Sequence, residues 1–213
     1  MASKFKAIIF DLGGVLVEWD PHSGEFITAS QLRILRNSKA WQDLDSGKLS
    51  LDEACKRFGK ILGLDSSAVK TSLDQILRSV TVKKQLAELI PELKRIEPDL
   101  EFYIMSNICQ EHFEVVRDAD LPWSLFNSIF LSGALSMRKP DLCFFQHVID
   151  AIGIEPSRIV MIDDKAANID AARSTGIYGL LADEAQVEIC TTLRNLMQYS
   201  STLPRITKTE ILV

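Results

Sequence analysis

Short apolar runs, rich in β-branched and aromatic residues, alternate with segments of helical periodicity along most of the chain. Four runs stand out and a fifth follows them, at residues 6–11, 101–106, 128–132, 158–163 and 176–181. Continuous apolar runs of this length are typical of strands that are buried on both faces. Because strands that alternate with helices form parallel sheets covered on both sides, we predict an α/β fold with a Rossmann-like, doubly wound parallel sheet.

Two segments between these runs carry a clear helical pattern. Apolar residues recur at helical spacing in 82–96 and form one stripe in 141–152. The second segment begins at Asp141, a residue type that caps helix N-termini, and stops at Gly153, a residue type that ends helices. Both segments are therefore predicted to be helices that pack on the sheet.

The span 21–81 has helical patterns and no strand pattern. Segments 25–36, 50–62 and 66–77 predict successive helices, separated by turns at 45–47 and 63–65. A helical insert after the first strand is the economical interpretation. We predict a core domain formed by 1–20 and 82–213, a cap formed by 21–81, and a loosely attached tail from Ser200.

Composition narrows the class of protein. The 213 residues include 24 Lys plus Arg and 29 Asp plus Glu, a net charge of −5, and 46% are hydrophobic, so the chain can bury a core. The sequence shows no stripe of basic residues, so we expect no nucleic-acid partner. No apolar stretch reaches the roughly 18 residues of a membrane span, and Asp11 interrupts the N-terminal apolar segment, where a signal peptide would be apolar. We expect a cytoplasmic protein.

Cysteine and histidine residues give no metal-binding pattern. No CxxC pair occurs, so the cysteines are interpreted as core or surface thiols. The residues concerned are Cys55, Cys109, Cys143, Cys190, His22, His112 and His147.

Three of the apolar runs end in a polar residue, namely Asp11, Ser106 and Asp163. Ligands of open α/β sheets bind at the carboxyl ends of the strands, so we expect these residues to converge on one crevice. Asp11 precedes a flexible Leu-Gly-Gly turn that allows close approach of a ligand. It could act as a nucleophile that forms an aspartyl-phosphate, or simply cap the turn.

Asp163 and Asp164 form an adjacent pair of carboxylates after a buried strand. Such a pair is costly to place unless a cation shares it, and hard oxygen ligands suit Mg²⁺. A role as helix N-cap is the alternative. Asn168 lies about one helical turn after Asp164.

Two further segments carry groups suited to binding phosphate. Ser106 and Asn107 offer a hydroxyl and an amide, and Lys139 offers an ammonium that could balance the charge of nucleophile and phosphate. A lysine taken alone is usually a solvated surface residue. The order of these groups along alternating strands and helices favours the phosphate interpretation.

This order resembles the four motifs of the haloacid dehalogenase (HAD) superfamily. Asp11 stands in the first motif, Ser106 in the second, Lys139 in the third and Asp163-Asp164 in the fourth, over nearly the whole chain. The helical insert is similar to the C1-type cap of the family. Within the superfamily, segments 131–132, 137–140 and 145–148 are most similar to bacterial sugar-1-phosphate phosphatases, with the lipid-phosphatase domain of soluble epoxide hydrolases a near relative.

The resemblance implies an Mg²⁺-dependent phosphatase that hydrolyses a small organic phosphate through an aspartyl-phosphate. Sugar phosphates and isoprenoid phosphates or diphosphates are candidate substrates, and the closing segment 203–213 is similar to the tails of fungal HAD-like proteins of terpenoid pathways. A homodimer is compatible with the apolar faces of the cap helices. The implied catalytic residues are Asp11 and Lys139, the implied phosphate-binding residues Ser106, Asn107 and Lys139, and the implied metal ligands Asp11, the Gly13 carbonyl, Asp163 and Asp164.

One position departs from the family pattern. Family phosphatases usually carry a second Asp two residues after the nucleophile, as a general acid and base worth about 10² to 10⁴ in rate, and this chain has Gly13. The sugar-1-phosphate phosphatases that it resembles also have Gly there. Glu18 or Asp20 could substitute for the missing acid.

Gly13 leaves two other functions open. The first is a HAD-fold binding or regulatory protein with little turnover. The second is a 2-haloacid dehalogenase, which uses the same nucleophile and also lacks the second Asp, although the paired carboxylates favour phosphate chemistry because dehalogenases need no metal. Trp19, Phe26 and Trp41 could line an apolar substrate pocket or belong to the core.

Overall fold

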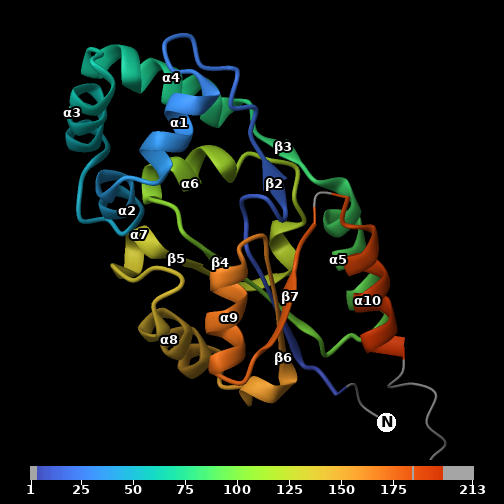
Figure 1. Ribbon diagram of the computed structural model, residues 1–213. Coiled ribbons are helices and arrows are strands. Elements are labelled where there is room, and N and C mark those ends of the chain that lie inside the picture. Colours follow the sequence, from blue (N-terminus) through green and yellow to red (C-terminus); the bar gives the residue numbers. More distant parts are fainter. Residues whose placement is uncertain (1–3, 184, 199–213) are drawn as a thin grey trace, which may run out of the picture.

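The computed structural model describes residues 4–183 and 185–198 (Figure 1), so the predicted tail from Ser200 lies outside the described residues. Its centre is a five-stranded parallel sheet with the order β5-β4-β1-β6-β7. The predicted α/β fold with a parallel sheet is therefore confirmed. The strands are β1 (Ala7–Phe10), β4 (Glu101–Ser106), β5 (Phe126–Leu131), β6 (Ile159–Asp163) and β7 (Tyr178–Leu181).

The sheet is covered on both faces because its apolar strands place successive side chains on opposite sides. Ile8 and Phe10 of β1 pack in one cluster with α5 (Lys84–Ile96), α6 (Gln110–Val116) and α10 (Val187–Gln198). Ala7 and Ile9 pack in the other cluster with α8 (Leu142–Ile152) and α9 (Ala166–Ser174). Figure 1 shows these two helical layers on either side of the central strands.

The edge strand β5 differs from its prediction. It runs over Phe126–Leu131 instead of 128–132, and Ser132 begins the short helix α7 (Ser132–Leu135). Asn127 and Ser128 are exposed, whereas a strand buried on both faces was expected. The reason is that β5 has only one neighbouring strand, β4.

The helix predicted over 82–96 begins later, as α5 at Lys84. Thr81–Val82 instead forms β3, which pairs antiparallel with β2 (Val17–Glu18). The Lys83 N–H also donates to the Leu16 carbonyl at 2.9 Å, so backbone pairing keeps this stretch extended. The helix predicted over 141–152 is confirmed, with Asp141 at its N-cap and Gly153, at φ 69°, at its C-cap.

The insert between β2 and β3 folds into four helices, α1 (Ala29–Arg36), α2 (Lys39–Asp45), α3 (Leu51–Leu62) and α4 (Ser66–Arg78). The sequence predicted three of them and missed α2. The first predicted helix begins at Ala29 and not at residue 25, because a capping box between Thr28 and Gln31 fixes its start. These helices share an apolar cluster of their own, and the division into core and cap domains stays a prediction.

The helical insert lies over the carboxyl ends of the strands (Figure 1). Its helix α2 contacts α7, and the Ser132 hydroxyl donates to the Asp45 carbonyl at 2.5 Å. Helix α2 therefore covers the end of the sheet at which ligands are expected. The remaining described elements are the 3₁₀ turns η1 (Trp123–Leu125) and η2 (Pro156–Arg158).

The four cysteines are free thiols, as expected: Cys143 is exposed and the other three are buried. Among the described helices, none combines the length and hydropathy that crossing a membrane requires.

Candidate active site

Three predicted site residues meet at one end of the sheet. Asp11 follows β1, and Ser106 and Asp163 end the two strands β4 and β6 that flank it. Because the strands are parallel and in register, their carboxyl ends lie side by side. The three residues are almost completely buried, with exposed fractions of 4%, 4% and 0% in the same order. The structure thus brings together the residues that the strand pattern singled out.

Lys139 lies between the two buried aspartates. Its Nζ is 2.9 Å from Asp11 Oδ1 and 2.6 Å from Asp163 Oδ2, and it donates to the Met105 carbonyl at 2.7 Å. The lysine is 1% exposed. A buried ammonium is tolerated only when it is paired and hydrogen-bonded, and the two carboxylates together with the carbonyl meet that requirement.

Burial and charge act in opposite directions on these groups. Burial raises the pKa of Asp11 to about 6, although the Lys139 ammonium beside it opposes the rise. Burial lowers the pKa of Lys139, but the carboxylates of Asp11 and Asp163 outweigh it, so the net shift is upward. The lysine therefore stays charged, and a further cation beside Asp11 would favour its ionised, nucleophilic form.

Asn107 fixes the position of Lys139. Its amide donates to the Lys139 carbonyl at 2.8 Å and its side-chain oxygen accepts the Lys139 N–H at 2.8 Å. The amide nitrogen carries a second hydrogen that these two bonds do not use. Asn107 therefore positions the lysine, and it could still donate to a phosphate oxygen.

Asp163 is held by several donors. The Asn168 amide lies 2.9 and 3.0 Å from its two oxygens, and the Lys165 N–H donates to it at 2.9 Å. Asp164, in contrast, is exposed. It lies against Gly14, where an added Cβ would come within 2.7 Å of Asp164 Oδ2.

Asp11, Asp163 and Asp164 can each offer one oxygen to a common ion, and these oxygens lie within 4.8 Å of one another. Three carboxylates face a single buried ammonium here, so a divalent cation would neutralise the remaining charge. Because the donors are hard oxygens, this set fits Mg²⁺.

The position of the missing second aspartate is closed. A Cβ added to Gly13 would lie 2.6 Å from a ring carbon of Trp19. The substitutes suggested by sequence have other surroundings: the Glu18 side chain is 61% exposed and pairs with Lys83 at 3.9 Å, and Asp20 is exposed and accepts the His22 N–H at 2.9 Å. The tryptophan ring therefore takes the place of a carboxylate beside the nucleophile.

Introducing the missing carboxylate at position 13 is expected to lower the stability of the protein without raising its activity. Gly13→Asp should lower the free energy of unfolding by about 1 to 3 kcal/mol, because the new side chain overlaps Trp19. It should not raise kcat, since the carboxylate cannot occupy the site while the ring is there. Urea unfolding and steady-state kinetics check both points. Gly13→Ala, which adds the clash without the charge, is the control, and a faster Gly13→Asp enzyme of unchanged stability would refute the expectation.

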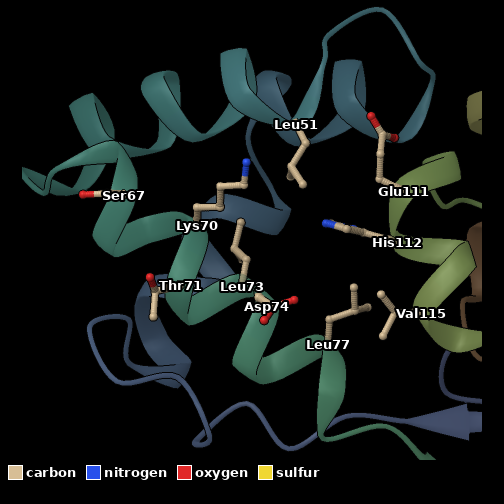
Figure 2. Close-up of a pocket in the computed structure, with 10 residues that line it drawn as sticks. All are labelled: Leu51, Ser67, Lys70, Thr71, Leu73, Asp74, Leu77, Glu111, His112 and Val115. Atoms are coloured by element: carbon tan, nitrogen blue, oxygen red, sulfur yellow. The ribbon is translucent and has the colours of Figure 1, made fainter.

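Trp19, Phe26 and Trp41, which the sequence suggested as lining an apolar pocket, do not line the cavity described below. Phe26 is 44% exposed, Trp41 stacks on Phe58 with ring centroids 5.5 Å apart, and Trp19 covers Gly13. A cavity of about 400 Å³ lies instead between α3, α4 and α6 (Figure 2). It is lined by Leu51, Ser67, Lys70, Thr71, Leu73, Asp74, Leu77, Glu111, His112 and Val115, none of which belongs to the acidic cluster.

Comparison with known proteins identifies the family of this chain. The family model for haloacid dehalogenase-like hydrolases matches residues 5–176. The chain therefore belongs to the haloacid dehalogenase-like hydrolase family, as its four motifs predicted.

Individual relatives are consistent with this assignment. The chain is 32% identical over 197 residues to the sesquiterpene phosphatase astK of Aspergillus oryzae, covering 92% of this chain and 99% of that protein. A HAD-like hydrolase structure from Porphyromonas gingivalis matches with a TM-score of 0.71 at 22% identity, over 91% of this chain and 98% of its own. A HAD family enzyme from Bacteroides thetaiotaomicron, in complex with magnesium and inorganic phosphate, matches with a TM-score of 0.69 at 20% identity, over 84% and 95%.

Proposed function

We propose that this protein is an Mg²⁺-dependent phosphatase that hydrolyses a small organic phosphate through a phosphorylated Asp11. The observation that carries the proposal is the arrangement of Asp11, which lies 2.9 Å from the buried ammonium of Lys139 and within 4.8 Å of the oxygens of Asp163 and Asp164. A nucleophilic carboxylate, an anchored cation and a set of metal-ligating oxygens are the parts that phosphoryl transfer requires.

The roles follow from the contacts. Among the described residues, the Leu12 N–H at 2.7 Å and the Lys139 ammonium both contact Oδ1 of Asp11, so Oδ2 is the oxygen proposed to attack phosphorus. Lys139 neutralises charge on nucleophile and phosphoryl group, and Ser106 and Asn107 would donate to the phosphoryl oxygens. Asp11, the Gly13 carbonyl and the Asp163-Asp164 pair would hold Mg²⁺, which when bound offsets the negative charge that opposes the attack.

The proposed substrate class is an isoprenoid phosphate. Support comes from the sesquiterpene phosphatase, which is 32% identical to this chain and matches along 99% of its own length. A sugar phosphate, the other class suggested by sequence, is a direct competitor in the same assay.

Removal of the metal is expected to stop the reaction. Chelation should lower kcat by about 10²-fold or more with farnesyl phosphate and with p-nitrophenyl phosphate, and added Mg²⁺ should restore it, because the ion is worth several kcal/mol in the transition state. In the absence of substrate, Mg²⁺ at 100 times its Kd should raise the free energy of unfolding by about 2.7 kcal/mol. The unfolding temperature should rise accordingly.

Two outcomes would favour the other hypotheses. Undiminished turnover after chelation, together with release of halide from 2-chloropropionate, would favour the dehalogenase. Mg²⁺ binding without hydrolysis of any phosphate ester in a broad panel would favour the binding or regulatory protein. The same purified preparation serves for all of these assays.

A further inference from the structure

A buried carboxyl group of the helical insert lies at the phosphate-binding end of the sheet. Asp45, the last residue of α2, is 6% exposed. Its carbonyl accepts a hydrogen bond from the Ser132 hydroxyl, which in turn accepts the N–H of Ile108 at 2.9 Å. Ile108 directly follows Ser106 and Asn107, the predicted phosphate ligands. Hydrogen bonds through Ser132 therefore connect the end of α2 to the loop that carries these ligands.

A second contact fixes the same turn. Gly47 lies so close to Gly133 that an added Cβ would be 2.3 Å from the Gly133 carbonyl oxygen. The end of α2 therefore contacts the segment that follows β5, and Ser132 of that segment is hydrogen-bonded to Ile108 after β4. Asp45 is held in place by backbone contacts that do not depend on its carboxyl group.

Three cationic side chains act on the charge of the Asp45 carboxyl group. The charges of Arg138 and Lys165 act on it, together with that of Arg36 from α1. The Lys165 ammonium also lowers the pKa of Asp11, as the smallest of the influences on that carboxyl group. Arg138 directly precedes Lys139, and its Nε is buried with no hydrogen-bond partner among the described residues.

The environment keeps Asp45 able to carry a proton near neutral pH. Burial raises the pKa of Asp45 to about 7, against the lowering by Arg138, Lys165 and Arg36 and by a hydrogen bond from the Trp41 side chain. A general acid is most effective when its pKa lies near the working pH. The thiol of Cys109 also faces this carboxyl group, and burial keeps that thiol protonated by raising its pKa to about 12.

Few carboxyl groups are buried in the part of the chain that the structure describes. The buried carboxyl groups there are those of Asp11, Asp45 and Asp163, and only Asp45 lies outside the proposed metal cluster. Position 13, where related phosphatases carry their acid, is closed by Trp19. Of these buried carboxyl groups, Asp45 is therefore the one that remains for proton transfer.

We propose that Asp45 is the general acid and base of this phosphatase, supplied by the helical insert in place of the residue absent at position 13. The inference rests on the proposed function. In the first step Asp11 forms a bond to phosphorus, the bond to the leaving oxygen breaks, and the Asp45 carboxyl gives its proton to that oxygen. In the second step water attacks the aspartyl-phosphate, Asp45 takes the proton of that water, and inorganic phosphate leaves with Asp11 regenerated.

The test is the dependence of Asp45→Asn on the leaving group. An alkyl phosphate such as farnesyl phosphate releases an alkoxide that needs a proton, whereas p-nitrophenyl phosphate releases a stable phenolate. Asp45→Asn should lower kcat/KM for the alkyl ester by about 10² to 10⁴-fold and for the phenyl ester far less. Asp45→Glu, which keeps a carboxyl group, should recover part of the alkyl activity.

The matched control is Asp52→Asn, the same change at a side chain of the insert that is 69% exposed. It should leave both activities unchanged. Equal losses for the two esters in Asp45→Asn, or no loss for the alkyl ester, would overturn the inference. A wild-type protein that hydrolyses neither ester would instead contradict the proposed function, so the two failures are distinguishable.

The pH profile of the wild-type enzyme tests the inference without any variant. Asp45 must be protonated to act as the acid, so kcat/KM for the alkyl ester should decline as the pH rises above about 7, while the phenyl ester should lack that decline. The charged groups that act on Asp45, and so influence its pKa, are Arg138, Lys165 and Arg36. Identical profiles for the two esters would contradict a role in proton transfer.

Discussion

The Asp11→Asn variant is expected to fold and to lose about 10⁴-fold or more of its phosphatase activity, as covalent hydrolases do when the nucleophile is removed. The amide oxygen can still accept the Leu12 N–H, and Lys139 keeps its contact with Asp163, so the local structure survives. The amide cannot form the phosphorylated intermediate. The loss should be large for both alkyl and phenyl esters, because neither can be cleaved by this route without the bond between Asp11 and phosphorus.

The measurement is kcat for both esters, with acid-quenched protein assayed for an acyl phosphate. Asp170→Asn, on the exposed face of α9 with a side chain that is 76% exposed, is the matched control and should retain full activity. Substantial turnover by Asp11→Asn would mean that another group attacks phosphorus.

The Lys139→Met variant is expected to show the largest loss of stability. It removes the ammonium shared by Asp11 and Asp163 and leaves two buried carboxylates without their cation. Breaking a buried ion pair from one side costs about 3 to 5 kcal/mol of unfolding free energy. Urea unfolding in the absence of metal measures it.

The loss should depend on pH in a defined direction. The pKa of Asp11 is already raised from 3.8 to about 6 in the folded protein, so the folded state binds more protons than the unfolded state between these values and loses stability as the pH rises. Removal of the ammonium raises this pKa further, so the deficit of Lys139→Met should grow from pH 4 toward pH 7. Lys48→Met, which removes an exposed lysine, should change stability by no more than about 0.5 kcal/mol, and an equal effect of the two variants would contradict a buried ion-pair cluster.

The sheet and the convergence of its polar strand ends were predictable from sequence for a physical reason. Strands buried on both faces must be apolar throughout, so a polar residue such as Asp11 or Asp163 marks the point where the strand leaves the core. Parallel strands then bring these points to one edge. Glycines that end helices, such as Gly153 at φ 69°, were readable because few other residues adopt that conformation.

Features set by contacts between distant parts of the chain were not predictable. Asp45 stands in an Asp-Ser-Gly sequence that is typical of an exposed turn, yet it is buried and its carbonyl accepts a hydrogen bond from Ser132, 87 residues away. The ring of Trp19 reaches Gly13 only because the intervening turn folds back, with the Gly14 N–H donating to the Val17 carbonyl at 2.7 Å. Helix α2, with seven residues, and the two-residue strands β2 and β3 are too short for a periodic pattern.

The burial of Lys139 could not be predicted from its residue type. By residue type alone it would be a solvated surface lysine, yet it is 1% exposed. Only its place in the order of four motifs indicated a functional role, and only the fold gave it two carboxylates as partners.

The most direct test of the central claim is a crystal structure of the protein soaked with Mg²⁺ and beryllium fluoride, a mimic of the phosphoryl group. We predict beryllium bonded to a carboxylate oxygen of Asp11, fluorines within hydrogen-bond distance of Ser106 and Lys139, and Mg²⁺ on oxygens of Asp11 and Asp163. Beryllium fluoride bound elsewhere, or Mg²⁺ absent from the cluster at saturating concentration, would contradict the account.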